Sequence, residues 1–171
     1  LTDNCGSPAV YDTVNIVVVP QLVLNMINIK NVSCFGGNDG AATVSVAGGA
    51  SPFGYLWSDG NTNATNNQLS AITYTITVTD SKGCSATITV SITEPPQLTT
   101  LAIPNDTICI GESSTFAVVP SGGTLPYKYV WSTGGTNAGL TVSPVTTTSY
   151  TVTVTDAKNC STTAVATVIV R

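Results

Sequence analysis

Cysteine is the residue type in this chain that could most readily do chemistry, because the sequence contains no histidine. The absence of histidine excludes His-based catalytic triads, His general bases and His metal ligands. The cysteines form no C-x-x-C pair, which disfavours a zinc or thioredoxin-like site. They are Cys5, Cys34, Cys84, Cys109 and Cys160. Widely separated cysteines between Thr-rich segments instead indicate a disulfide framework in an oxidising, extracellular setting.

The segments that must position these cysteines are repeated along the chain. "YTITVTDSKGC" at residues 74–84 recurs as "YTVTVTDAKNC" at residues 150–160, and Pro-Gln-Leu at 20–22 recurs at 96–98. So many matches in the same order indicate a tandem array of homologous units. We therefore expect one unit at 21–96 and a second at 97–171. Residues 1–20 match the end of a unit, which predicts the final strand of a preceding repeat followed by a linker.

The hydrophobic pattern within each unit predicts antiparallel β-strands. In the segment 74–79, Tyr74, Ile76 and Val78 alternate with threonines, and the segment 86–93 alternates in the same way. An alternation of period two is typical of strands with one buried face and one wet face. Asp80–Gly83 and Asp156–Asn159 have the composition of tight hairpin turns. Several short strands in each unit predict a small β-sandwich.

The spacing of the cysteines is nearly the same in the two units, 50 and 51 residues, which predicts one disulfide in each. Each unit has one cysteine near its first strand and one in its last hairpin. We therefore expect the pairs Cys34–Cys84 and Cys109–Cys160, which would staple two small cores. Cys5 aligns with the hairpin cysteines, so its expected partner lies upstream of residue 1; the rival is an interchain disulfide.

Four aromatic residues are expected in the two cores. Trp57 and Trp131 occupy the middle of their units, as the buried tryptophan of an Ig-type sandwich does, and Tyr74 and Tyr150 open the next-to-last strand, as in a tyrosine corner. The functional alternative is a sugar-stacking platform made by Trp57 and Tyr55.

Asp80 and Asp156 are expected to cap the last hairpin of each unit, a turn role that suits Asp. The rival role is that of a calcium ligand, but the nearby sequence lacks the dense set of carboxylates that calcium prefers.

Charge and hydropathy exclude several classes of partner. Only 8% of the residues are charged and the formal net charge is −4, which disfavours nucleic-acid binding. No run of 18 apolar residues occurs, so we expect no membrane insertion. The Gly-rich stretch 36–40 precedes an expected strand, so it does not fit a phosphate-binding loop. No catalytic constellation recurs, and we expect neither enzymatic activity nor a cofactor.

The two units resemble a known family. "SCFGGNDGAATVSVAGGASPFGYLWSDG" at 33–60, followed by residues 74–96, resembles the SprB-type repeat of giant surface adhesins from gliding bacteria. The motifs C-x-G-x-x-D-G, GG-x-x-P-[FY]-x-[YF]-x-W-S-[DN]-G and Y-T-[VI]-T-V-T-D-x-x-G-C are present in order. The second unit replaces the N-D-G stretch by "IGESSTF" and is similar instead to the related Ig-like modules that neighbour such repeats.

This resemblance implies an all-β chain of tandem small Ig-like (PKD-like) antiparallel β-sandwiches. It also implies export by the type IX route, display on the bacterial cell surface, and a stalk or adhesive role without catalysis, as in gliding motility. The implied partners are neighbouring repeats or copies of the same protein, with a surface polysaccharide as a further candidate. Thr13 and Thr107 match the D-[ST]-[apolar] O-glycosylation motif of such bacteria.

Two other functions compete with the stalk. The apolar segment 10–19 lacks a hairpin partner within the chain, so it could add to a sheet edge of a neighbouring copy and build an extracellular filament. The second alternative is a carbohydrate-binding module, which requires exposed aromatic side chains, whereas only 6% of the residues are aromatic.

Overall fold

The computed structural model describes residues 20–171. Three sequence-based expectations therefore lie outside the described residues. They are the strand at 10–19 within the unit 1–20, the role of Cys5, and O-glycosylation of Thr13.

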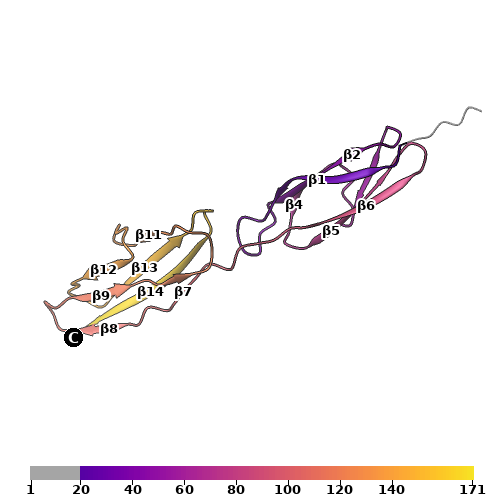
Figure 1. Ribbon diagram of the computed structural model, residues 1–171. Helices are drawn as coiled ribbons and strands as arrows, with labels where there is room; N and C mark the ends of the chain where they lie inside the picture. Colours follow the sequence, from indigo (N-terminus) through magenta and orange to yellow (C-terminus); the bar gives the residue numbers. More distant parts are fainter. Residues whose placement is uncertain (1–19) are drawn as a thin grey trace, which may run out of the picture.

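The described chain is all-β and forms two Ig-like sandwiches that follow one another along a single axis (Figure 1). Residues 20–171 contain no helix, which confirms the predicted fold class. The first hydrophobic core is made by residues between Val32 and Ile92, and the second by residues between Ile103 and Val168. The segment around Pro96 joins the two sandwiches.

The first sandwich has two three-stranded sheets, ordered β1-β2-β4 and β3-β5-β6. Every neighbouring pair of strands in them is antiparallel. The strands are β1 (Val23–Lys30), β2 (Gly40–Ala47), β3 (Gly54–Trp57), β4 (Thr65–Leu69), β5 (Thr73–Thr79) and β6 (Ser85–Ser91).

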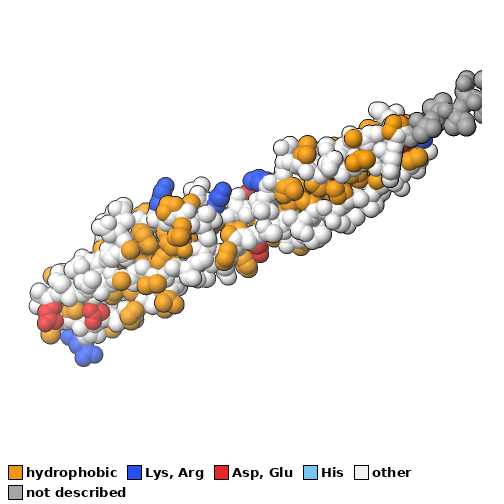
Figure 2. Space-filling model, viewed as in Figure 1, with side chains coloured by type: hydrophobic (Ala, Val, Ile, Leu, Met, Phe, Trp, Pro, Cys, Tyr) orange, Lys and Arg blue, Asp and Glu red, His pale blue; other side chains and the backbone are white. Residues whose placement is uncertain are grey.

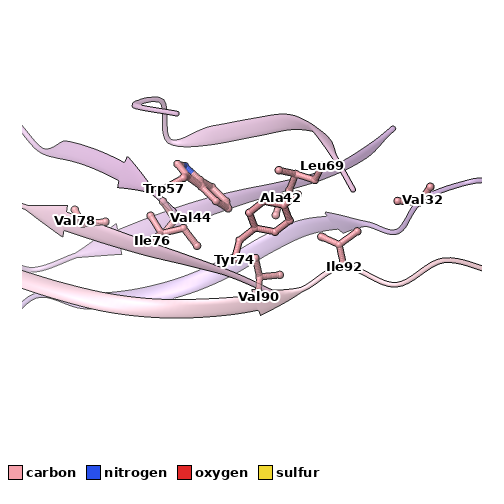
Figure 3. Close-up of a cluster of buried hydrophobic side chains, with 10 residues drawn as sticks. All are labelled: Val32, Ala42, Val44, Trp57, Leu69, Tyr74, Ile76, Val78, Val90 and Ile92. Atoms are coloured by element: carbon pink, nitrogen blue, oxygen red, sulfur yellow. The ribbon is translucent and has the colours of Figure 1, made fainter. Parts of the chain in front are cut away.

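The alternating sequence builds the first core. On β5, Tyr74, Ile76 and Val78 are buried, whereas the threonines between them are exposed or half-buried. These apolar side chains pack with Trp57 of the neighbouring β3 in the same sheet and with Ala42 and others from the facing sheet (Figure 3). Because side chains of successive strand residues point to opposite faces, the Thr/Ser positions form the wet side of each sheet.

The second sandwich contains three sheets, ordered β11-β13-β14-β8, β12-β9 and β10-β7. Its core is again made by alternating residues, including Val152 and Val154 of β13. The strands are β7 (Thr99–Thr100), β8 (Asp106–Ile108), β9 (Ser114–Ala117), β10 (Pro120–Ser121), β11 (Lys128–Trp131), β12 (Gly139–Val142), β13 (Thr148–Thr155) and β14 (Ser161–Val170).

The first strand differs between the two sandwiches. In the first, β1 stays paired with β2 through an irregularity between Ile27 and Lys30, where Asn28 has a φ of 52°. In the second, the corresponding segment is divided: β7 pairs with β10, and β8 pairs in parallel with β14. Pro104 lies between β7 and β8, and proline has no N–H to donate to a strand ladder. The chain therefore leaves one sheet there and joins the other.

Charged side chains are sparse on the surface, which is mostly uncharged on the face shown in Figure 2. One salt bridge occurs among residues 20–171, between Lys30 and Asp39. No helix in this part of the chain is long and apolar enough to cross a bilayer.

Candidate functional site at the junction between the sandwiches

A disulfide links the two sandwiches. Cys34 of the first unit is bonded to Cys160 of the second, 126 residues away in the sequence, whereas Cys84 and Cys109 carry free, exposed thiols. This finding corrects the expected pairs Cys34–Cys84 and Cys109–Cys160. The cysteines join neighbouring units rather than stapling each unit internally.

The length of the strands explains why the expected pairing fails. Cys34 precedes the beginning of β2, whereas the hairpin that carries Cys84 is bonded to the turn after the end of β2, through Ser81 N–H to Ala50 O at 2.9 Å. An eight-residue strand spans about 26 Å. The Cα atoms of a disulfide lie at most about 6.8 Å apart. Two cysteines at opposite ends of a sandwich can therefore bond only to other units.

The turn that carries Cys34 is held by two acidic residues. Asp39 accepts hydrogen bonds from Ser33 N (2.7 Å), Ser33 Oγ (2.6 Å) and Lys30 Nζ (2.8 Å). Hydrogen bonding from Lys30, followed by that from Ser33, holds the pKa of Asp39 well below its ordinary value. Glu94, just before the linker, accepts from Gly36 N at 2.5 Å. The N-D-G stretch thus shapes the loop that reaches the second unit.

The opposite side of the junction is built around Asp156. Its carboxylate accepts from the backbone N–H of Thr124 (2.8 Å), Lys158 (2.8 Å) and Cys160 (2.9 Å). It therefore fixes the last hairpin to the Gly-Gly turn at 122–123. Gly123 N donates in turn to Pro96 O at 2.8 Å, so this turn also holds the linker. Gly122 has a φ of 75°, and a Cβ there would collide with the Gln97 carbonyl oxygen.

The same anchor exists at the far end of the first unit. Asp80 accepts from the N–H groups of Ala50, Lys82 and Cys84, and Gly49 N donates to Pro20 O at 2.8 Å. Burial alone would raise the pKa of Asp80 and of Asp156, but the backbone N–H donors outweigh it and the net pKa lies below the ordinary value. In both residues each carboxylate oxygen accepts at least one N–H, so the structure places them as hairpin caps rather than as calcium ligands.

Apolar and polar side chains surround the disulfide. Cys34 and Phe35 from the first unit line a cavity with Gln97, Leu98, Cys160 and Ser161 from the second. Leu98 is 8% exposed, and Cys160 Sγ lies 3.4 Å from the Ser33 carbonyl oxygen. The junction therefore combines a covalent bond with a small packed contact.

The two tryptophans lie in the cores. Trp57 is 1% exposed and Trp131 is 2% exposed, and their indole N–H groups donate to the Asn63 and Asn137 carbonyls at 2.8 and 2.9 Å. A side chain with so little exposed area cannot offer a face to a sugar ring. Tyr55 is half-buried against the same core as Trp57.

The two tyrosines also lie in the cores, in different settings. The Tyr74 hydroxyl accepts from Ser70 N at 3.1 Å, as a tyrosine corner requires, whereas Tyr150 packs against Phe116 with ring centroids 6.4 Å apart. Thr107 is exposed on β8, and its O-glycosylation stays a prediction.

No group of three or more His, Cys, Asp or Glu residues suited to a metal ion occurs within residues 20–171. The groups at the junction can form a disulfide and hydrogen bonds. The sequence analysis missed the junction as a site, although one signal for it was present. In the first unit, Cys34 precedes the eight-residue β2, and Cys84 lies in a hairpin bonded to the turn beyond the end of β2.

A comparison with protein families finds one repeat model that matches the chain twice. Residues 26–62 and 102–136 match the model of the SprB repeat. Two segments of the chain, one in each unit, are thus similar to the SprB repeat. The second match lies within the unit that the sequence analysis assigned to related Ig-like modules, so the same SprB model matches part of each unit despite the missing N-D-G stretch. No curated protein sequence matches the chain.

Solved structures with similar folds are built from tandem domains. The three N-terminal domains of the outer capsid protein Hoc from bacteriophage RB49 are 17% identical with a TM-score of 0.50, covering 90% of this chain and 59% of that one. The titin I-band fragment I67–I69 is 14% identical with a TM-score of 0.48, covering 91% and 66%. The present chain spans 59% and 66% of these two structures, and at these identities the likeness to Hoc concerns the fold alone.

Proposed function

We propose that this chain is a load-bearing, non-catalytic segment of a stalk in a bacterial cell-surface protein. The observation that carries this proposal is the Cys34–Cys160 disulfide between consecutive sandwiches. A bond across the linker resists hinge motion, which domains joined by a small interface otherwise show by default. An extracellular location is supported by the disulfide itself, since such bonds persist in oxidising compartments. In this role the stalk presents an adhesive surface, as part of a secreted protein that serves attachment or gliding.

The position of the disulfide determines how the chain carries tension. A force applied between the two ends enters at the first unit, crosses from Cys34 to Cys160, and leaves through β14. The segment between the two cysteines, which covers most of both cores, is bypassed. The sandwiches can therefore lose non-covalent structure without the stalk lengthening by the whole chain.

Single-molecule force spectroscopy tests this mechanism. Removing the bond in the double variant Cys34→Ser, Cys160→Ser should release about 420–450 Å of additional contour length, at roughly 3.3–3.6 Å per residue. The control is Cys84→Ser, Cys109→Ser, which keeps the bond and should unfold like the native chain. Equal contour lengths for the native chain and the Cys34→Ser, Cys160→Ser variant would refute load bearing through the disulfide.

Surface display is tested separately in the native bacterium. Antibodies against the two sandwiches should label intact cells, and protease added outside should remove the label. The free thiols of Cys84 and Cys109, if they stay unbonded, should react there with a membrane-impermeant maleimide. Labelling that requires cell lysis would contradict the proposed location and leave the mechanical result standing.

A further inference from the structure

We call the junction bonded through Cys34 and Cys160 the closed junction. It has two halves, and a similar copy of each half, with its cysteine unbonded, occurs elsewhere in the described chain. The first half is the turn with Cys34 and Phe35; the second is the socket formed by Gln97, Leu98, Cys160 and Ser161. Within residues 20–171, a second turn, at Cys109, and a second socket, at Cys84, take no part in this junction.

The open socket lies at the end of the first unit away from the junction. A pocket of about 210 Å³ is lined by residues that include Gln21, Leu22, Cys84 and Ser85. Each of these four stands 76 positions before its counterpart in the closed socket, with the same residue type. The supporting bonds also match: Asp80 N donates to Cys84 O at 2.9 Å, as Asp156 N does to Cys160 O. The open socket thus has the framework that holds a cysteine turn in the closed one.

The open turn lies at the other end of the molecule, in the loop between β8 and β9 near the C-terminus (Figure 1). Glu112 N donates to Cys109 O at 3.1 Å, as Gly37 N does to Cys34 O at 3.0 Å. The third residue of each turn is a glycine with positive φ, +97° for Gly111 and +69° for Gly36, as in a type II turn. An apolar residue follows each cysteine: Phe35 in the closed junction and Ile110, 69% exposed, in the open turn.

We propose that a second copy of this chain docks head to tail, with the Cys109 turn of one copy in the Cys84 socket of the next. The contact repeats the geometry that the chain already shows between its own units. It is heterologous, so it leaves an open turn and an open socket at the ends and permits further addition. This inference goes beyond the proposed stalk function, because it names what contacts both ends of the molecule.

Docking brings the thiol of Cys109 in one copy next to the thiol of Cys84 in the next copy, where the two can be oxidised to a disulfide. Each thiol loses one proton and one electron, an S–S bond forms between Cys109 and Cys84 of the next copy, and a small disulfide such as oxidised glutathione accepts both electrons and both protons, becoming two thiols. In the closed junction Leu98, the counterpart of Leu22, is 8% exposed, whereas Phe35, the counterpart of Ile110, is 52% exposed; the docked contact therefore covers Leu22 and part of Ile110.

Complementary variants test the proposal in the full chain. Both carry Cys5→Ser, and each adds either Cys84→Ser or Cys109→Ser; these two residues are exposed, so the sandwiches should fold. In a glutathione redox buffer, each variant alone should stay monomeric, whereas the mixture should form a covalent dimer that peptide mapping assigns to Cys84–Cys109. Dimers that form as readily in the separate variants as in the mixture would overturn the proposal, because they would show random collision of thiols.

A second measurement separates docking from the reactivity of exposed thiols. Ile110→Asp in the Cys84→Ser partner weakens the apolar contact and should slow dimer formation by about threefold or more, since the counterpart Phe35 is 52% exposed and only full burial of such a side chain is worth roughly tenfold or more. The matched control is Val130→Asp, an exposed residue on β11, which should leave the rate unchanged. Equal rates for both substitutions would refute the docked contact even if a Cys84–Cys109 bond formed.

Discussion

Cys34 and Cys109 begin the same kind of turn at the same place in two homologous sandwiches, yet one is bonded and the other is free. The difference does not come from the turns, because the backbone hydrogen bond and the positive-φ glycine are the same in both. It comes from the neighbouring unit: Cys34 is bonded to the last hairpin of the second unit, whereas Cys109 has no disulfide partner within residues 20–171. Each unit therefore completes its own sandwich, whereas its disulfide requires a neighbouring unit.

A second difference lies in how each turn is supported. The Cys34 turn is tied to Asp39 and Glu94, whereas Glu112, within the turn itself, accepts from Cys109 N at 2.8 Å. Unlike sequences thus produce similar turns, because each supplies a carboxylate to the same kind of backbone donor. The comparison of the two units suggests which changes should act equally on both and which should act on one alone.

The largest effect should come from the core tryptophans, and it should be equal in the two units. Trp57→Ala and Trp131→Ala should each destabilise their own sandwich by about 3–5 kcal/mol, because each removes a fully buried indole and leaves a cavity. Urea unfolding followed by far-UV circular dichroism measures the loss in the altered unit, and the fluorescence of the remaining tryptophan is the internal control because it reports on the other unit. If only one of the two substitutions lowered the stability of its own unit, the two cores would not be equivalent.

Acid should weaken both sandwiches through Asp80 and Asp156. Their folded-state pKa lies below the ordinary value of 3.8, so the folded state binds fewer protons there than the unfolded state. The stabilisation is complete above the unfolded pKa and is lost as the pH falls toward the folded pKa.

Urea unfolding from about pH 6 down to about pH 2 measures this dependence. Asp80→Asn, Asp156→Asn should be less stable at the upper pH and lose less on acidification. Asp106→Asn, at an exposed residue of β8, is the matched control. An unchanged pH profile in the double variant would contradict the capping role.

Ser114→Ala should act on the second unit alone and should stabilise it. Ser114 is 1% exposed and its hydroxyl has no hydrogen-bond partner in the described chain, whereas Ala42 occupies the similar buried place in "ATV" of β2. Removing a buried, unsatisfied hydroxyl should raise the unfolding free energy by about 1 kcal/mol. Thermal unfolding of the variant checks this, and Ser113→Ala, at an exposed neighbour, serves as the control. A destabilised variant would indicate that water or a partner satisfies the hydroxyl.

The smallest effect should come from the threonine pairs on the wet faces. Thr43 Oγ1 and Thr65 Oγ1 lie 2.9 Å apart, and so do Thr115 Oγ1 and Thr141 Oγ1. Cross-strand pairs of this kind contribute roughly 0.2–1 kcal/mol. Thr65→Ala and Thr141→Ala should therefore shift the urea midpoint slightly and by similar amounts. A double-mutant cycle with Thr43 or Thr115 that shows no coupling would remove these contacts from the account of stability.

Much of the fold could be predicted because it depends on local patterns. Alternation on β5 and β13 predicts which side chains are buried, and the recurrence of Trp57 as Trp131 predicts two equivalent cores. Even the division of the first strand in the second unit had a signal in Pro104, since proline interrupts a strand ladder. Asp80 and Asp156 were expected as hairpin caps from their position, but their bonds to the Gly-Gly turns join segments about 30 residues apart and follow from packing.

The sequence by itself determined the repeat, the sandwich class and the buried face of each strand, because these follow from periodicities of two residues and from the recurrence of motifs. Only the tertiary structure decided which cysteines bond. Equal spacing made Cys34 and Cys84 look like partners, but β2 separates them by the length of a sandwich. A disulfide requires Cα atoms within a few ångströms of each other, and that proximity arises where two units meet, so it is a property of neighbouring units rather than of either sequence segment.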